Sequence, residues 1–294
     1  MKRAAYTIAS IVMAIGLIGL FFFLVEGKQI PVLNPTGEVA DAQRNLFLFT
    51  VSLSALVVLP VFGLLAYISI KFREGNTRAK YRPEWSENGL LESIWWGIPI
   101  LIIGVLAVVT YQTSHSLDPY KQLSGEQPLE VQVVAMQWKW LFLYPDQGVA
   151  SLNQVYIPSN RPVRLTMTAD APMSAFWIPS LGSQTYAMNG MHSQLNLKGK
   201  QEGEYTGYTT NINGEGYAKM TFTAKVVKQN DFNAWVASTS KAPSVMDMTE
   251  YDKLAKPMSM TEERIYTMPD KTLFSSISSK YDHSHGMSDE EHSS

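Results

Sequence analysis

Glu92 is the residue of this sequence best placed to do chemistry, because it directly precedes an apolar run without charges, residues 93–114. Ionisable groups within or beside a membrane segment often mark functional sites. The alternative role is structural, since an acidic residue in a helix's first turn stabilises the helix dipole by ~0.3–1 kcal/mol. The residues around Glu92 leave both roles open.

A second candidate site is the polar segment 205–222, YTGYTTNINGEGYAKMTF, which includes a strand pattern at its end. A loop with so many Asn, Thr and Gly residues can hold a ligand. The chain contains no cysteine, which excludes disulfides, thiolate metal sites and cysteine nucleophiles. Asn211 and Asn213 by themselves would give a metal ion little affinity, because neutral amides need carboxylate or imidazole ligands beside them.

The histidines form no pattern typical of a catalytic or metal site. His115 follows the run 93–114 and is expected at the membrane interface, while His192 is expected in a strand. His283, His285 and His292 lie in the terminal stretch YDHSHGMSDEEHSS. This stretch could bind metal adventitiously, but a solvated, disordered tail explains it better. We therefore predict no metal site in this chain.

Three uncharged stretches, 4–25, 46–70 and 93–114, are long enough to cross a bilayer. A helix needs roughly 20 apolar residues to span about 30 Å of hydrocarbon. The first stretch follows Lys2 and Arg3, so residues 1–27 are either a signal peptide or an N-terminal transmembrane helix. We favour the retained helix. Residues 28–127 are expected to form a transmembrane helical hairpin.

The distribution of basic residues predicts the orientation of this hairpin. Loop 26–45 carries only Lys28 and Arg44, whereas loop 71–92 carries Lys71, Arg73, Arg78, Lys80 and Arg82. Because basic loops stay in the cytoplasm, the chain after about residue 115 is expected outside, in the periplasm or its equivalent. The net charge of −2 gives no electrostatic reason to expect nucleic-acid binding.

From about residue 128 the apolar residues alternate with polar ones, as in LEVQVV (129–134), RPVRLTMT (161–168), HSQLNL (192–197) and YAKMTFTAKVV (217–227). Turn signals separate these runs, which is typical of an antiparallel sandwich or barrel. We place this external domain at 128–227. Residues 228–294 are expected to be an aromatic- and Met-rich extension, with a short helix at 231–238 and a disordered tail.

Four motifs, in order and at matching spacing, resemble subunit II of the haem–copper oxidases: WSENGLLESIWWGIPILII (85–103), MQWKWLFLYPDQG (136–148), FWIPSLGSQTYAMNGM (176–191) and YTGYTTNINGEGYAKM (205–220). The similarity covers about residues 33–255 and is closest to the quinol oxidase branch of the cytochrome bo type. It implies a membrane-anchored α+β fold, with two or three transmembrane helices followed by an all-β, cupredoxin-like Greek-key sandwich.

In cytochrome c oxidases this sandwich holds a dinuclear copper centre through the motif C-x-E-x-C-G-x-x-H-x-x-M and an upstream His. A mixed-valence copper pair needs the two bridging thiolates and the imidazoles. The corresponding positions here are Thr209, Asn211, Asn213, Tyr217, Met220 and, for the upstream His, Ser174. Only Met220 is retained, so the resemblance implies that this chain binds no copper and has no cofactor of its own. Met220 is then expected in the core.

The resemblance also implies the partners of the chain. Without a copper centre, a membrane quinol would feed electrons directly to subunit I, which carries haems and one copper in this family. Ubiquinol is favoured over menaquinol only by the closeness to the bo branch. Partners would be subunits I, III and IV, in the bacterial inner membrane. Trp138 and Trp140 are expected to pack the sandwich against the membrane subunit, and Glu92 to lie at the entrance of a proton pathway of subunit I.

Two alternatives stay open at this point. The first is a cytochrome c oxidase subunit II that binds copper, against which the lack of cysteine argues strongly. The second is a non-enzymatic, membrane-anchored cupredoxin used for assembly or binding. The match in the spanning region and Glu92 argue against the second, because a mere anchor does not need them.

Overall fold

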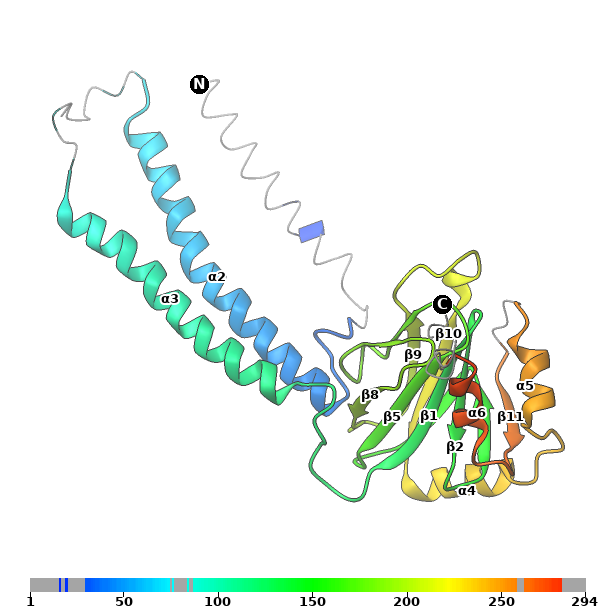
Figure 1. Ribbon diagram of the computed structural model, residues 1–294. Coiled ribbons are helices and arrows are strands. Elements are labelled where there is room, and N and C mark those ends of the chain that lie inside the picture. Colours follow the sequence, from blue (N-terminus) through cyan, green and yellow to red (C-terminus); the bar gives the residue numbers. More distant parts are fainter. Residues whose placement is uncertain are drawn as a thin grey trace, which may run out of the picture.

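The computed structural model describes residues 30–74, 76, 84, 87–257 and 262–281, together with Gly16, Gly19 and Leu20. The expected signal or anchor segment, 1–27, therefore lies almost entirely outside the described residues. The histidine-containing tail after residue 281 lies outside them as well. Figure 1 shows the described chain as a long helical hairpin joined to a β-sandwich.

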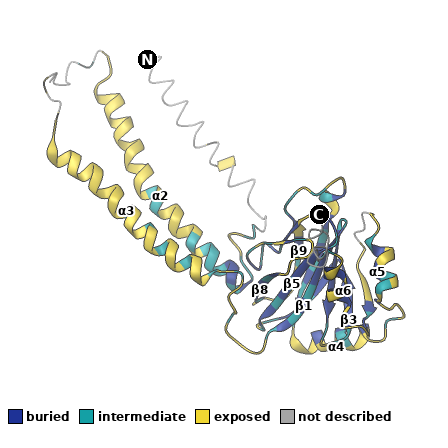
Figure 2. Ribbon diagram, in the orientation of Figure 1, coloured by how far each residue is buried: buried dark blue, intermediate teal, exposed yellow. Residues whose placement is uncertain are grey.

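Both predicted spans in 28–127 are helices, α2 (Glu38–Lys71) and α3 (Gly89–Ser116). Each is long and apolar enough to cross a membrane. Most of their side chains are exposed in the isolated chain, apart from the end of α2 next to the sandwich, as the yellow ribbon in Figure 2 shows. A helix that is apolar all round needs lipid or other helices around it. The hairpin therefore anchors the chain in a membrane.

The external domain consists of two sheets within the described residues. The larger has the strand order β11-β3-β2-β1-β5-β8, and the smaller has the order β4-β10-β9-β6-β7. The strands are β1 (Leu129–Met136), β2 (Lys139–Tyr144), β3 (Val149–Leu152), β4 (Gln154–Pro158), β5 (Val163–Ala169), β6 (Ser174–Trp177), β7 (Thr185–Ala187), β8 (Ser193–Leu197), β9 (Gly203–Thr209), β10 (Thr221–Val227) and β11 (Arg264–Thr267). The sandwich is confirmed, but it is not purely antiparallel, because β1 pairs with β5 and β10 with β4 in parallel.

The core between the sheets is built from the side chains that alternate inward along each strand. Trp140, Phe142, Phe176 and Phe222 meet at its centre, and the Phe176 and Phe222 rings stack with centroids 4.8 Å apart. Such aromatic contacts add roughly 0.5–1.5 kcal/mol beyond the burial of their area. Met220 belongs to the same core, as predicted.

Strand β2, KWLFLY, is buried along its whole length instead of on alternate residues. Its second face is covered by the segment after residue 227, which contains α4 (Gln229–Thr239), α5 (Met248–Ala255) and α6 (Leu273–Ser279). Leu141 and Leu143 pack there against Leu254 and Phe274 in a second apolar cluster. The helix predicted at 231–238 is confirmed as α4. The expected domain limit at 227 needs correction, because β11 completes the larger sheet by pairing with β3.

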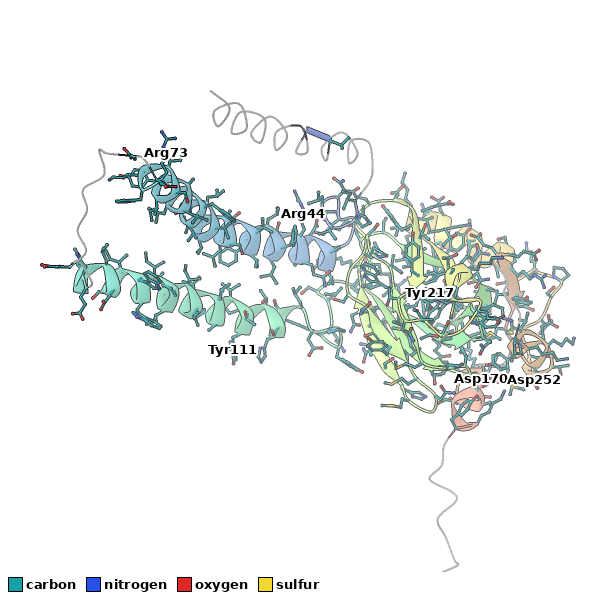
Figure 3. All side chains as sticks on the ribbon, turned by 90° about the horizontal axis from the view of Figure 1, so that it is seen from above. Arg44, Arg73, Tyr111, Asp170, Tyr217 and Asp252 are labelled. Atoms are coloured by element: carbon teal, nitrogen blue, oxygen red, sulfur yellow. The ribbon has the colours of Figure 1, made fainter. Side chains whose placement is uncertain are left out.

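One carboxylate fastens this C-terminal extension to the sandwich. Asp170 follows β5 and accepts hydrogen bonds from the hydroxyls of Tyr251, at 2.5 Å, and Tyr281. Its side chain is 10% exposed and also lies 3.3 Å from the ammonium group of Lys280. Figure 3 labels Asp170 and, nearby, Asp252, a more exposed partner of Lys280. Burial and the neighbouring carboxylate both raise the pKa of Tyr251.

The hairpin is fastened to the sandwich at its other end. The backbone N–H groups of Thr36 and Gly37 both donate to the carbonyl of Ser180, at 2.9 and 3.1 Å. A Cβ at Gly37 would collide with the Leu181 carbonyl oxygen, so this close approach requires glycine. Lys198 and Lys200 add ion pairs to Glu38 and Asp41 in the first turn of α2.

Replacing Asp170 with Asn should loosen the extension, because charge-assisted hydrogen bonds from a buried tyrosine and a lysine are weakened together. We expect a loss of about 2 kcal/mol in the free energy of opening of this segment. The measurement is amide hydrogen exchange of β11 and α6 in the purified protein.

The matched control is Asp252→Asn, whose ion pair with Lys280 is exposed and should contribute less than about 0.5 kcal/mol. Equal exchange rates in both variants would show that Asp170 does not fasten the extension.

Candidate functional site

The loop 209–220, which runs from the last residue of β9 to the start of β10, contains five of the positions that the resemblance aligns with copper ligands. The structure brings three of the aligned residues together. The amide nitrogen Nδ2 of Asn213 donates to the hydroxyl of Ser174 at 2.8 Å and to the sulfur of Met220 at 3.2 Å. Ser174 and Met220 are both buried. A hydrogen-bonded amide thus joins β6, the loop and the start of β10.

Asn211 is turned to the backbone of a neighbouring segment. Its Nδ2 donates to the carbonyl of Met173, and its Oδ1 accepts the N–H of Ala175 at 2.5 Å. The carboxamide therefore acts as a clip between the loop and the start of β6. Both of its polar ends are used in this way, so Asn211 is not available as a ligand.

Thr209 and Tyr217 are not part of the Asn213 contact. Thr209 is buried, and its backbone N–H donates to the Met220 carbonyl at 3.3 Å. Tyr217 begins a 3-10 turn, Tyr217–Lys219, so the strand predicted from 217 starts only at Thr221. Among the described residues no hydrogen bond joins the Tyr217 side chain to Ser174 or Asn213. Figure 3 labels Tyr217 in this part of the sandwich.

Trp138 supports the loop from the turn between β1 and β2. It has a positive φ of 61°, and its indole N–H donates to the carbonyl of Asn213 at 3.3 Å. A Cβ at Gly216 would collide with the indole, so only glycine fits beneath the ring. Trp140 is different, because it is completely buried in the sandwich core. The expectation that it packs against another subunit is therefore wrong for Trp140.

This arrangement does not fit a dinuclear copper centre. Such a centre needs bridging thiolates and imidazoles, whereas the aligned groups here are hydroxyls, amides and one thioether. Both polar ends of the Asn211 amide are engaged by protein groups, and so is Nδ2 of Asn213, whereas Oδ1 of Asn213 is buried without a hydrogen-bond partner among the described residues. No cluster of three or more His, Cys, Asp or Glu side chains that could hold a metal occurs in the described part of the chain.

Glu92 lies in the first turn of α3, at the end of the hairpin farthest from the sandwich (Figure 1). The helix is capped by Asn88, whose side chain accepts the N–H of Leu91 at 3.1 Å. Glu92 is exposed in the isolated chain. A helix of this length is long enough to place its carboxyl group and the sandwich on opposite sides of a bilayer. Its role in proton entry stays a prediction.

His115 and His192 both have local partners. His115 lies in the last turn of α3, where its Nδ1 is 2.8 Å from the Tyr111 carbonyl oxygen. His192 precedes β8, and its Nε2 is 2.7 Å from the hydroxyl of Ser278 in the extension. Neither contact indicates a catalytic or metal-binding role.

Several charged residues were not identified from the sequence as important. Lys139 stands between the two tryptophans, is fully buried, and donates to the carbonyl of Lys256 at 2.9 Å. Burial lowers its pKa. Asp170 follows an ordinary alternating strand, and the sequence indicates Arg44 only as a loop charge. The sequence contains no signal for the first two, because their partners lie more than 80 positions away in the sequence.

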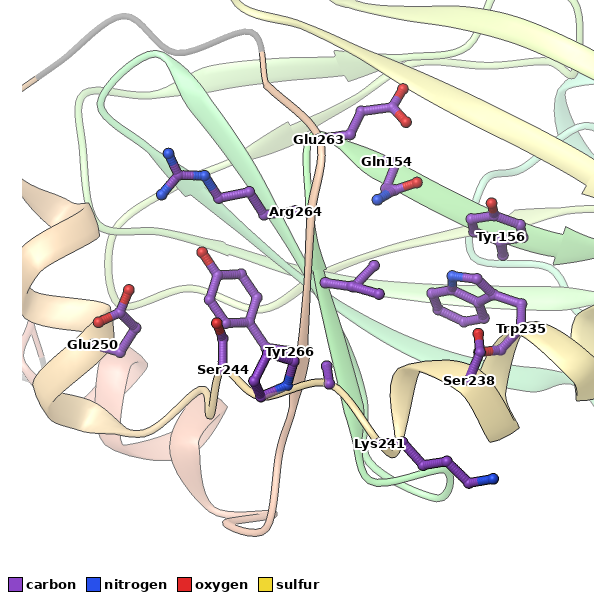
Figure 4. A pocket seen from close by; sticks show the side chains of 13 residues that line it. Gln154, Tyr156, Trp235, Ser238, Lys241, Ser244, Glu250, Glu263, Arg264 and Tyr266 are labelled. Atoms are coloured by element: carbon purple, nitrogen blue, oxygen red, sulfur yellow. The ribbon is translucent and has the colours of Figure 1, made fainter.

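A groove of about 870 Å³ lies between α4 and the edge strands β4 and β11. Tyr156 and Trp235 stack in it with ring centroids 4.3 Å apart, and Glu263, Arg264 and Lys241 line its rim, as Figure 4 shows. The loop 209–220 is at the opposite end of the sandwich from α4 (Figure 1). The groove is thus separate from the candidate site.

Comparisons with known proteins give the context of this site. Residues 148–227 match the family model described as cytochrome c oxidase subunit II, periplasmic domain. Cytochrome bo(3) ubiquinol oxidase subunit 2 of Pseudomonas putida is 40% identical over 264 residues, 90% of this chain and 84% of the relative. Ubiquinol oxidase subunit 2 of Acetobacter aceti is 40% identical over 261 residues, 88% of this chain and 85% of the relative. Among solved structures, the periplasmic domain of cytochrome oxidase subunit II of Bradyrhizobium japonicum covers 40% of this chain and 96% of its own length, with 23% identity and a TM-score of 0.37.

Replacing Asn213 with Asp should destabilise the loop, since it removes both Nδ2 donors and adds a carboxylate to a mostly apolar site. We expect a cost of about 1–3 kcal/mol at neutral pH. Burial raises the pKa of such a carboxyl group in the folded protein. The cost should therefore shrink as the pH falls and the group is protonated in both the folded and unfolded states. Hydrogen exchange of the amides of 209–220 measures the effect.

Ile212→Ala is the matched control, because Ile212 is on the same loop and is 84% exposed. If the Asn213→Asp variant and this control behave alike, the Asn213 amide does not hold the loop.

Proposed function

The chain belongs to the subunit 2 family of the quinol oxidases, and we propose that it is the non-redox subunit of a proton-pumping terminal oxidase. The complex would oxidise ubiquinol and reduce oxygen to water. The names of the relatives from Pseudomonas putida and Acetobacter aceti support ubiquinol as the substrate. A membrane anchor followed by a cupredoxin-like sandwich fits this role.

The observation that carries the proposal is the state of the loop 209–220. Its centre is an amide, Asn213, hydrogen-bonded to a hydroxyl and a thioether, where the copper-binding members need thiolates. The chain has no cysteine at all to supply them. With no redox group in this chain, electrons from the quinol would pass directly to the haems and copper of subunit I.

The partners follow from the exposed surface of the hairpin. Helices α2 and α3 leave most of their apolar side chains uncovered, which suits contact with the membrane-embedded subunit I and with lipid. The basic loop 71–92 would lie in the cytoplasm of a bacterial cell and the sandwich in the periplasm. In this arrangement the sandwich caps the outer face of subunit I, and Trp138 supports the loop at its edge.

We assign Glu92 to proton entry. Its position at the cytoplasmic end of α3 would expose its carboxylate to water next to subunit I. There it could take up a proton and release it inward when the haem site is reduced. Glu92 can stabilise the dipole of α3 from its first turn and still take part in proton entry.

Purification of the native complex should yield an enzyme that oxidises ubiquinol and does not oxidise reduced cytochrome c. Metal analysis of the complex should give copper only for the subunit I site, and its optical spectrum should lack a dinuclear copper band. These outcomes follow because no thiolate is available in this chain.

Turnover with cytochrome c, or a dinuclear copper band, would contradict the proposal. Reduction of the haems by menaquinol in preference to ubiquinol would change only the quinol named in the proposal, and the rest of the proposal would stand.

Glu92→Gln should slow haem reduction and proton uptake by up to about a hundredfold, the lower end of what a positioned proton-transfer group contributes. Assembly with subunit I should be retained, because the capping residue Asn88 is intact. Stopped-flow reduction by ubiquinol, followed at the haem bands, measures the rate.

The matched control is Glu87→Gln, an exposed carboxylate just before the cap, which should leave the rate unchanged. Normal rates and normal proton uptake in the Glu92 variant would exclude the role.

A further inference from the structure

A polar cavity of about 520 Å³ lies where α2 leaves the sandwich, lined in part by Asn34, Asp41, Arg44 and Gln201. We propose that this cavity binds the phosphate of a phospholipid headgroup, in the membrane leaflet on the side of the sandwich. The inference goes beyond the proposed oxidase function, and it depends only on the hairpin crossing a membrane.

The position of Arg44 on α2 sets the level of the cavity. The uncharged run 46–70 begins two residues later, and as a helix it extends over roughly 37 Å, enough to cross the hydrocarbon. Arg44 therefore stands just outside the apolar layer, at headgroup level. Figure 3 labels Arg44 near the sandwich and Arg73 just past the other end of the same helix.

Among the described residues, Arg44 is the charged residue at this cavity that has no ion-pair partner. Asp41 is 2.6 Å from Lys200, and Glu38 is 3.1 Å from Lys198, so both acids of the first turn are neutralised. The Nε atom of Arg44 is buried and has no hydrogen-bond partner among the described residues. An anion in the cavity, which Arg44 lines, would supply the guanidinium with a counter-charge and its terminal N–H groups with acceptors.

The chemistry of the lining selects phosphate among anions. A guanidinium binds phosphate oxygens through two parallel N–H groups, and side-chain amides such as those of Asn34 and Gln201 can donate to the remaining oxygens. Gln201 is held at the cavity by its backbone, whose N–H donates to the Thr36 carbonyl at 3.3 Å. The Asp41 carboxylate would oppose an anion, but Lys200 already pairs with it.

The helix surface next to Arg44 indicates a lipid as the source of the phosphate. Phe47, Leu48 and Val51 follow at i+3, i+4 and i+7, so they lie on the same face of α2, deeper in the membrane. All three are exposed, at 47%, 40% and 47%. A headgroup on Arg44 would therefore direct its acyl chains along an apolar stripe, which a free phosphate ion would not use.

The test is native mass spectrometry of the purified complex in detergent, titrated with phosphatidylglycerol. We expect one tightly held phospholipid, and we expect Arg44→Gln to weaken its binding about tenfold or more, as for loss of a charge-assisted hydrogen bond. Arg44→Lys should give an intermediate affinity, because it keeps the charge and loses the fork. Arg73→Gln, the same change at the other end of α2, should have no effect.

Gln201→Ala removes one amide donor from the cavity without changing α2. This variant tests the proposal if the Arg44 variants do not assemble. Equal phospholipid binding in the Gln201 and Arg44 variants and the unmodified complex would overturn the proposal. So would displacement of the lipid by inorganic phosphate alone, since the acyl chains would then contribute nothing. Loss of the co-purifying subunits in Arg44→Gln with unchanged lipid binding would also overturn it, because Arg44 would then pair with a partner subunit.

Discussion

The hydrogen bonds of the Asn213 amide determine how the sandwich is closed at the end that bears the loop 209–220. The amide holds the Ser174 hydroxyl and the Met220 sulfur together, and Trp138 holds the Asn213 carbonyl in turn. A metal centre would join the same strands through covalent ligands. Here a set of neutral hydrogen bonds, each worth only about 1 kcal/mol, does this work with the surrounding core.

Because these bonds are individually weak, the rest of the domain must be rigid around them. The inner aromatic core fixes β6, which the loop contacts, and β10, which follows the loop. The C-terminal extension covers the outer face of the larger sheet and is fastened by Asp170. The two cores bury β2 and the second half of β1 on both faces, which gives the loop a stiff support.

The attachment of the hairpin adds a second constraint, because it sets the sandwich in a defined position relative to the membrane. Thr36 and Gly37 bond directly to Ser180, so little flexible chain separates the two parts. The same short junction forms the cavity at Arg44 and places it at headgroup level. Glu92 lies a full helix length away from this junction. If the sandwich is outside the membrane, Glu92 would be on the opposite, cytoplasmic side, where a group that collects protons is needed.

Local patterns in the sequence were sufficient to predict the two membrane helices, the sandwich, the short helix α4 and the absence of thiolates. Each of these features depends on composition or on a short repeat, and such local properties are present in the sequence whatever the tertiary structure. Other features emerged only from the folded chain: the parallel pairing of β1 with β5, the addition of β11 to the larger sheet, and the internal position of Trp140. The fold also determines that Ser174, Asn213 and Met220 meet, and that Arg44 has no acidic partner among the described residues. These features depend on contacts between distant segments, and such contacts are settled by how the whole core packs, which no local pattern records.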